Sequence, residues 1–373
     1  MKALQIGNLK VEVPIVQGGM GVAVSLSGLA SAVANQGGIG VISSVGIGLH
    51  YGTGKYTRAN DREGFRHEIR KARQLSPNGV IGANIMLAVS DFDNFFKLAL
   101  EEKLDIVFVG AGLFIKKPET VTTEEFINSK TKLVPKISSA RAAQLTFKVW
   151  DEKFHRLPDA VVIEGAKAGG HLGFKKQELL DGPKSIYQII KETREILLPF
   201  QDKYGFEIPI IAGGGIYTGK DIQKAFLSGA NGVKMGTRFV TTHECDADIN
   251  FKMQYINATK PEDVVIIDSP VGLPGRAIDN DFLRGVAKGN KKPVSCPFKC
   301  LKTCNYKEVP YCIAEALYNA SIGDFENGFA FAGSNGYRAT EIISVEETFN
   351  QIKAEYLEAK FNAKRAEIDA ILV

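Results

Sequence analysis

One histidine on a glycine-rich turn is the residue of this sequence best placed for acid–base chemistry. His171 lies in the segment Ala-Gly-Gly-His-Leu-Gly at 168–173, shortly after a short apolar run at 160–163. An apolar run of that length predicts a buried strand. Glycines after it, Gly170 among them, let the backbone approach a ligand closely. Because histidine changes its charge near neutral pH, we predict that His171 is a catalytic base.

Two further glycine sites favour a phosphate ligand. Gly213, Gly214 and Gly215 follow an apolar run at 208–212, and Gly236 and Thr237 follow another at 232–235. Consecutive backbone N–H groups at the end of a strand can cradle a phosphate. In (β/α)₈ barrels the phosphate often lies at the loops after strands seven and eight. We therefore prefer a bound phosphate over glycines that only permit tight turns.

The first of these glycine sites also comes close to the P-loop of a nucleotide triphosphatase. Gly214, Gly219 and Lys220 have the spacing G-x-x-x-x-G-K, but Asp221 stands where a Ser or Thr should meet Mg²⁺. Thr218 and Asp221 predict the capping box of the following helix instead. The glycine pairs at 38/40, 46/48 and 110/112 lack the third glycine of a dinucleotide fingerprint. A mononucleotide fits better, and the P-loop remains an alternative that Asp221 opposes.

Four of the five cysteines are concentrated in one short segment, at Cys296, Cys300, Cys304 and Cys312. The spacing fits neither the Cys-x₂-Cys pairs of zinc ribbons nor the runs of ferredoxins. Cys300 and Cys304 could share one face of a helix. We expect reduced structural or redox-linked thiols and no metal, and these four residues are the candidate ligands of the alternative, a metal-binding module.

Eight alternations of strand and helix must position these residues. Strands are expected at 13–17, 39–43, 80–86, 104–109, 132–137, 160–163, 208–212 and 232–235, with helices between them and a long loop at 46–64. Buried strands that alternate with helices indicate a parallel sheet. Eight units in roughly 240 residues have the size of a (β/α)₈ barrel. The expected fold is therefore an α/β TIM barrel, with a doubly wound sheet as the alternative.

Smaller signals concern the ends of these elements. Near copies at 14–19 and 209–214 suggest that the first and seventh strands are neighbours at one rim. Ser25 is the expected N-cap of the first helix. Gln17, Met20 and Asn84 stand at strand ends and could together line a flat ligand.

The alternation stops after residue 241. We expect the barrel at 1–241, a smaller domain at 242–340 that covers the barrel mouth and carries the cysteines, and a C-terminal helix at 341–373 that packs back on the barrel. A net charge of +4 with no basic stripe argues against nucleic-acid binding. No apolar stretch has the length of a membrane span, and no signal peptide is apparent. A cytoplasmic enzyme with a small-molecule substrate is expected, and a homodimer is left open.

With these motifs in hand, the sequence resembles the FMN-dependent nitronate monooxygenase (2-nitropropane dioxygenase-like) family and the related FMN-containing enoyl-ACP reductases. The resemblance extends from residue 12 to about 345 and rests on segments 14–21, 82–86, 168–173, 212–215 and 235–238. It implies a TIM barrel with non-covalent FMN, a nucleotide-binding flavoprotein in which His171 acts near the substrate. The residues expected at the cofactor are Gly19, Met20, Asn84, Gly170, Ala212, Gly213, Gly214, Gly215, Met235, Gly236 and Thr237.

The activity that the resemblance implies is oxidation of alkyl nitronates or nitroalkanes with O₂, which yields a carbonyl compound and nitrite. The alternative is an NADH-dependent enoyl-thioester reductase on the same scaffold. Glu164 with Gly165 looks more like the reductase branch, and Lys234 takes a position where monooxygenases often carry glutamine. The cysteine segment is not part of the familiar monooxygenase pattern.

Overall fold

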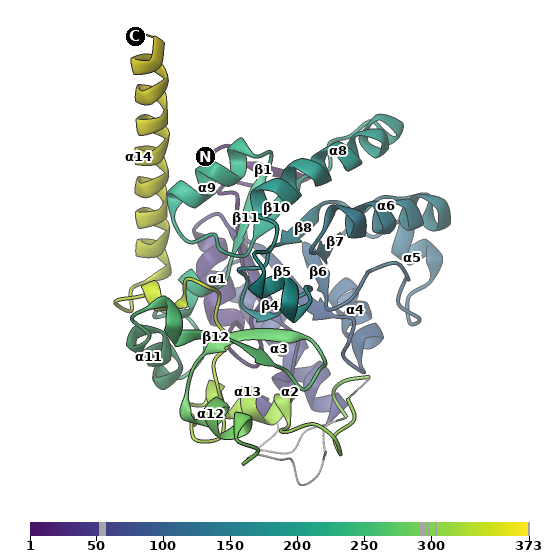
Figure 1. Cartoon of the computed structure of the whole chain (residues 1–373). Helices are drawn as coiled ribbons and strands as arrows, with labels where there is room; N and C mark the ends of the chain where they lie inside the picture. Colours follow the sequence, from purple (N-terminus) through teal and green to yellow (C-terminus); the bar gives the residue numbers. More distant parts are fainter. Residues whose placement is uncertain (52–56, 291–295, 297–298, 303, 372–373) are drawn as a thin grey trace.

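A closed barrel of eight parallel strands forms the centre of the molecule (Figure 1). The computed structural model describes residues 1–51, 57–290, 296, 299–302 and 304–371, and side chains to residue 365. Around the barrel the strands are β3 (Ile15–Gln17), β4 (Ile39–Ser43), β5 (Val80–Met86), β6 (Ile106–Gly110), β7 (Lys132–Ile137), β8 (Val161–Glu164), β10 (Ile210–Gly213) and β11 (Gly232–Met235). The eight predicted strands and the TIM-barrel fold are confirmed.

The two similar strand segments are not neighbours, which corrects one expectation. β11 lies between β3 and β10 and pairs with both of them. The likeness of segments 14–19 and 209–214 has another physical reason. The glycines that end both segments line the same cavity, described below.

Helices surround the barrel, and one of them begins earlier than expected. The larger ones are α1 (Ser27–Asn35), α3 (Arg58–Leu75), α4 (Phe92–Glu101), α6 (Ala140–Phe154), α8 (Ile186–Tyr204) and α9 (Gly219–Leu227). The short ones are α2 (Ile47–Tyr51), α5 (Thr123–Ile127), α7 (Lys176–Leu180) and α10 (Thr237–Val240). The loop expected at 46–64 is therefore wrong where the chain is described, because α2 and the first turns of α3 occupy most of it. Residues 52–56 of that segment lie outside the described residues. Thr57 caps α3 by accepting a hydrogen bond from the Asn60 N–H, 3.0 Å away.

A hairpin at the N-terminus closes the amino end of the barrel. β1 (Leu4–Ile6) and β2 (Leu9–Val11) pair in antiparallel fashion. Their buried side chains join an apolar cluster with inward-facing strand residues, among them Val16, Val41 and Phe108. This hydrophobic layer leaves the carboxyl ends of the strands as the open mouth.

The later part of the chain reaches back to the glycine turn that carries the histidine. It contains α11 (Ile249–Asn257), η1 (Pro261–Asp263), β12 (Val264–Asp268), β13 (Pro274–Ile278), α12 (Asp281–Ala287), α13 (Ile313–Ser321) and η2 (Gly336–Arg338). β12 pairs with β13, and β13 pairs with the short strand β9 (Gly170–His171). One three-stranded sheet thus joins segment 264–278 to the loop after β8. The division of the chain into domains at 241 and 340 remains a prediction.

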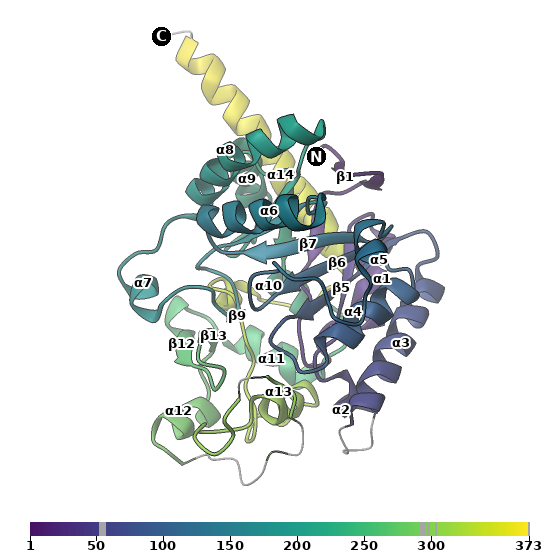
Figure 2. The same cartoon turned by 90° about the vertical axis from the view of Figure 1, so that its right-hand side faces the viewer.

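The C-terminal helix α14 (Val345–Ile371) packs on the barrel only along its first part. It contacts α9, α1 and α10, and its remainder extends away from the body in both views (Figures 1 and 2). Leu357 and Phe361 on this helix are 62% and 67% exposed. No helix in the described part of the chain is both long and apolar enough to cross a membrane.

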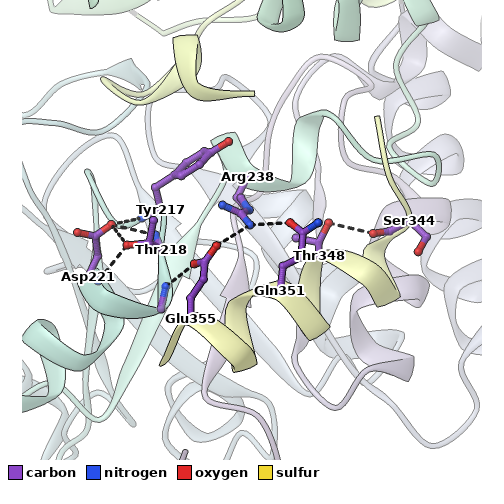
Figure 3. Close-up of polar contacts among 9 residues, drawn as sticks. Tyr217, Thr218, Asp221, Arg238, Ser344, Thr348, Gln351 and Glu355 are labelled. Atoms are coloured by element: carbon purple, nitrogen blue, oxygen red, sulfur yellow. Dashed lines mark hydrogen bonds and ion pairs between the residues drawn. The ribbon is translucent and has the colours of Figure 1, made fainter. Parts of the chain in front are cut away.

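Polar contacts around Arg238 attach α14 to α9 and α10 (Figure 3). These two helices follow the glycine loops at 213–215 and 236–237, which are called the phosphate-type loops below. The Arg238 guanidinium donates to Gln351 Oε1 at 3.0 Å and to Glu355 Oε1 at 3.1 Å. The other Glu355 oxygen accepts from the backbone N–H of Gly219 at 2.7 Å. α14 therefore fixes both α10 and the first turn of α9.

Candidate active site

A cavity of about 620 Å³ lies at the carboxyl ends of the barrel strands. This volume is typical of sites for small molecules and cofactors. Strand-end loops of the barrel and residues from the later segment line it together. The predicted site residues that the structure brings to its wall are Gly19, Met20, Asn84, Gly170, His171, Gly213, Gly214, Gly215, Gly236 and Thr237.

Three residues expected at a ligand are not among those lining the cavity. Ala212 and Met235 are buried in the apolar cluster between the barrel and its helices. Successive side chains of a strand point to opposite faces, so each faces away from the interior when its neighbours, Ile211 and Lys234, face inward. Gln17 is buried and accepts a hydrogen bond from the Val41 N–H at 2.8 Å. Its amide thus holds β3 to β4.

The glycine end of the cavity is built from three loops. Gly214 and Gly215 have φ angles of +95° and +84°, a conformation that glycine adopts without strain. Asn335 donates to the Gly215 carbonyl at 3.1 Å, and the Gly333 N–H donates to the Thr237 hydroxyl at 3.0 Å. The segment 333–335, which our sequence analysis missed, therefore joins the two predicted phosphate loops. Its sequence, Gly-Ser-Asn-Gly at 333–336, is rich in glycine and polar residues and could have indicated a loop at the ligand.

Inward-facing polar side chains form a layer between the cavity and the apolar end of the barrel. Lys136 and Glu164 form an ion pair at 2.9 Å. The buried amine of Lys234 has no hydrogen-bond partner among the described residues and lies 4.3 Å from the centre of the Phe108 ring. Burial, together with the charge of Lys136, holds the pKa of Lys234 well below its usual value. The Asn84 Oδ1 also lacks a partner within the described chain.

The Asn84 Oδ1 and the Lys234 Nζ, called the two orphan atoms below, indicate where a polar group of a ligand would lie. A buried donor or acceptor without a partner costs about 1–3 kcal/mol. Asn84 and Lys234 both line the cavity, so a bound group that pairs with them would remove this cost. Period-two alternation along β7, β8 and β11 could have identified Lys136, Glu164 and Lys234 as one inward layer.

His171 occupies the side of the cavity formed by the later segment. It lies on β9, where it pairs with Gly275 of β13, and not on a barrel strand. Its Nε2 is 2.6 Å from the Ser269 hydroxyl, and its ring packs edge-on against Phe331 with centroids 4.9 Å apart. Burial lowers the pKa of His171 to about 4. The imidazole is therefore neutral near pH 7.

Arg276 holds the turn that precedes His171. Its Nη1 donates to the carbonyls of Ala166 and Ala168, at 2.6 and 2.7 Å. Because Arg276 is on β13 beside the partner of His171, one strand fixes both the turn and the histidine. Neither Ser269 nor Arg276 had a signal in the sequence, since their role depends on a pairing of segments far apart in the chain.

The P-loop alternative is opposed by the first turn of α9. The predicted capping box is present, with Asp221 accepting from the Thr218 N–H at 2.9 Å (Figure 3). Glu355 accepts from the Gly219 N–H. Two carboxylates thus occupy the helix N-terminus where a P-loop would bind phosphate.

The cysteines are brought together but not on a helix. Cys296, Cys300, Cys304 and Cys312 line a second cavity of about 210 Å³. Among the described residues, 299–302 and 304 are not helical, so the expected helix face shared by Cys300 and Cys304 is wrong. No three His, Cys, Asp or Glu side chains of the described chain are placed to hold a single metal ion.

We expect His171 to stay uncharged well below neutral pH. In the folded protein the pKa of His171 is about 4, below its ordinary value of 6.5, so the folded state takes up a proton less readily than the unfolded state. The free energy of unfolding is therefore unaffected by this residue above pH 6.5 and decreases as the pH falls toward 4. The ring resonances of His171, assigned by comparison with His171→Ala, should not titrate between about pH 8 and 5. A midpoint near 6.5 would contradict the buried environment.

Comparisons with known proteins were consistent with this architecture. A family model described as nitronate monooxygenase matches residues 2–101 and 67–355. A Staphylococcus aureus (strain JH9) protein described as "Probable nitronate monooxygenase" is 25% identical over 362 residues, which cover 89% of this chain and 91% of that protein. The solved structure of FabK from Thermotoga maritima is 27% identical, with a TM-score of 0.72 over 95% of this chain and 96% of the other.

A third relative has a different described activity. A Rhodococcus jostii (strain RHA1) protein described as a (3aS,4S,5R,7aS)-5-hydroxy-7a-methyl-1-oxo-octahydro-1H-indene-4-carboxyl-CoA dehydrogenase is 26% identical over 276 residues. The match covers 74% of this chain but only 65% of that relative's length.

Proposed function

The chain belongs to the nitronate monooxygenase family of oxidoreductases, and from this membership we propose that it is an FMN-dependent enzyme that oxidises alkyl nitronates. The products are a carbonyl compound and nitrite, with O₂ as the electron acceptor. The observation that carries the proposal is the cavity itself. It combines glycine loops at one end, two polar atoms at the barrel interior without partners in the described chain, and a neutral histidine on the side formed by the later segment.

The residues of the cavity fit a flavin mononucleotide. Gly213–Gly215, Gly236 and Thr237 would hold the phosphate through backbone N–H groups and a hydroxyl. The orphan Asn84 Oδ1 and Lys234 amine would meet polar edges of the ring system, and Met20 supplies an apolar surface beside them. Bound FMN would supply the redox chemistry, since it can take electrons from a substrate and pass them to O₂.

His171 is better suited to hold a nitronate than to create one. A base with a pKa of about 4 is a poor acceptor for a proton on carbon, because each unit of pKa mismatch costs about 1.4 kcal/mol. A neutral imidazole can instead hydrogen-bond an oxygen of an anion that has already lost its proton. Ser269 and Phe331 fix the orientation of the ring. The preferred substrate is therefore the nitronate anion and not the neutral nitroalkane.

An enoyl-thioester reductase that uses NADH is the second candidate. The Glu164–Gly165 pair, the likeness to FabK and the CoA-thioester substrate in the Rhodococcus relative's name favour it.

Anaerobic reduction distinguishes the two candidates. The purified protein should be yellow and should release FMN on denaturation. Rapid bleaching of the flavin by a preformed alkyl nitronate, but not by NADH, is the result expected for the first candidate. Bleaching by NADH and reoxidation by an enoyl thioester would select the second. A colourless protein that does not take up added FMN would exclude both.

A further inference from the structure

The four clustered cysteines surround a cavity that the proposed chemistry does not use. Cys296, Cys300, Cys304 and Cys312 all line it, and all four are free thiols. Apolar side chains complete the wall, including Leu301, Val309 and Ile313.

The size of this cavity does not suit a single metal ion. A zinc ion draws its four sulfur ligands to about 2.3 Å and leaves no space among them. Among the described residues, no three His, Cys, Asp or Glu side chains are placed to share one metal ion. A volume of about 210 Å³ matches the liquid volume of roughly seven water molecules. Four thiols around that much space suit a group of several atoms.

Four cysteine thiolates are the usual ligand set of iron–sulfur clusters. We propose that Cys296, Cys300, Cys304 and Cys312 bind a [4Fe–4S] cluster in this cavity. The spacing Cys-x₃-Cys-x₃-Cys-x₇-Cys differs from that of ferredoxins, but the structure places all four residues in the wall of one cavity. Ligand geometry, and not the interval along the chain, decides what the site can hold.

Basic residues are frequent in the sequence around the first three cysteines, since positions 282–307 contain six lysines and one arginine and no acidic residue. Lys299 itself lines the cavity. Cys312 is the N-cap of α13, so it lies at the end of the helix whose dipole favours negative charge.

The cavity is fixed beside the candidate active site. Cys300, Leu301 and Ile313 line both cavities and so form the wall between them. The segment around Cys300 is bonded to the loop after β5, where the Ser90 N–H donates to the Cys300 carbonyl at 2.9 Å and the Ser90 hydroxyl to the Lys299 carbonyl at 2.8 Å. The position next to the barrel mouth is thus set by the barrel itself.

Analysis of iron, zinc and acid-labile sulfide in wild-type protein purified without oxygen tests the proposal. About four iron and four sulfide per chain are expected, with an electron paramagnetic resonance signal after reduction by dithionite. Protein isolated without metal should take up the same amounts from ferrous iron and sulfide. Zinc in place of iron, iron without sulfide, or no uptake would each overturn the proposal.

A pair of serine variants locates the ligands. Cys300→Ser should lose most of the iron and sulfide. Cys245→Ser is the matched control, since Cys245 is buried elsewhere with its thiol 3.3 Å from the Val24 carbonyl, and it should keep them. Flavin content and circular dichroism check that each variant is folded. A full iron and sulfide content in a folded Cys300→Ser would contradict the assignment. Metal content does not depend on nitronate turnover, so failure here and failure of the proposed function are distinguishable.

Discussion

Replacement of His171 by alanine should leave flavin binding intact and lower kcat/KM for a nitronate by about a hundredfold. The histidine lies on β9 and contacts Ser269 and Phe331, whereas the phosphate-type loops and the orphan atoms belong to other elements. Loss of a hydrogen bond to a charged substrate costs about 1.5–3 kcal/mol, and each 1.4 kcal/mol is a factor of ten. Flavin content by absorbance and steady-state rates with a preformed nitronate measure the two effects separately.

Two matched variants separate a substrate-holding role from a base. His171→Asn keeps a hydrogen-bonding side chain but cannot accept a proton, so it should recover part of the nitronate activity. Ser269→Ala removes the group 2.6 Å from Nε2 and should cause a smaller loss, of about tenfold, because the ring keeps its contact with Phe331. If His171→Ala turns over nitronate at the wild-type rate, the histidine has no catalytic role. If His171→Asn is as slow as His171→Ala, the holding role is wrong.

Lys234→Met should make the protein more stable and bind FMN more weakly. The buried amine has no hydrogen-bond partner in the described chain, and its removal should raise the free energy of unfolding by about 1–3 kcal/mol. Methionine has a similar length and adapts to irregular spaces. If the amine meets the flavin, its loss should weaken FMN binding by about tenfold. Denaturant unfolding of the flavin-free protein and a flavin titration measure these opposite effects.

Lys136→Met is the matched control, and it should change the free energy of unfolding in the opposite direction. Lys136 pairs with Glu164 at 2.9 Å, and both side chains are mostly buried. Removing the lysine leaves an unpaired carboxylate in the barrel and should lower the free energy of unfolding by about 2 kcal/mol. If both lysine variants are destabilised equally, Lys234 has a partner that compensates its burial, and the argument for a ligand at that amine fails.

Sequence patterns predicted the barrel because its strands are short, apolar and bounded by glycines. They also led to the two glycine loops and to His171, whose types and positions carry local information. Motif membership does not specify which face of a strand a side chain takes, so it could not show that the side chains of Ala212 and Met235 are buried behind the barrel wall. The strand period of two gives that face directly, and it also groups Lys136, Glu164 and Lys234.

Contacts between distant segments could not be predicted in this way. Asp246 caps α1 by accepting from the Leu26 and Leu29 N–H groups, at 2.7 and 3.1 Å, whereas the expected cap, Ser25, bonds the Met20 backbone instead. The partners of His171 likewise come from segments about a hundred residues later in the chain. Such contacts depend on the path of the chain, which no local pattern encodes.

The sheet that joins β9 to β13 also sets an order of events during synthesis. Protein chains leave the ribosome amino end first. All eight barrel strands have emerged once residue 235 has left the ribosome, but β9 cannot pair until Gly275 and Arg276 follow. Gly333 and Asn335, which join the two glycine loops, come later still. The barrel strands can therefore pair before either side of the candidate site is complete, so the site is assembled after the scaffold that carries it.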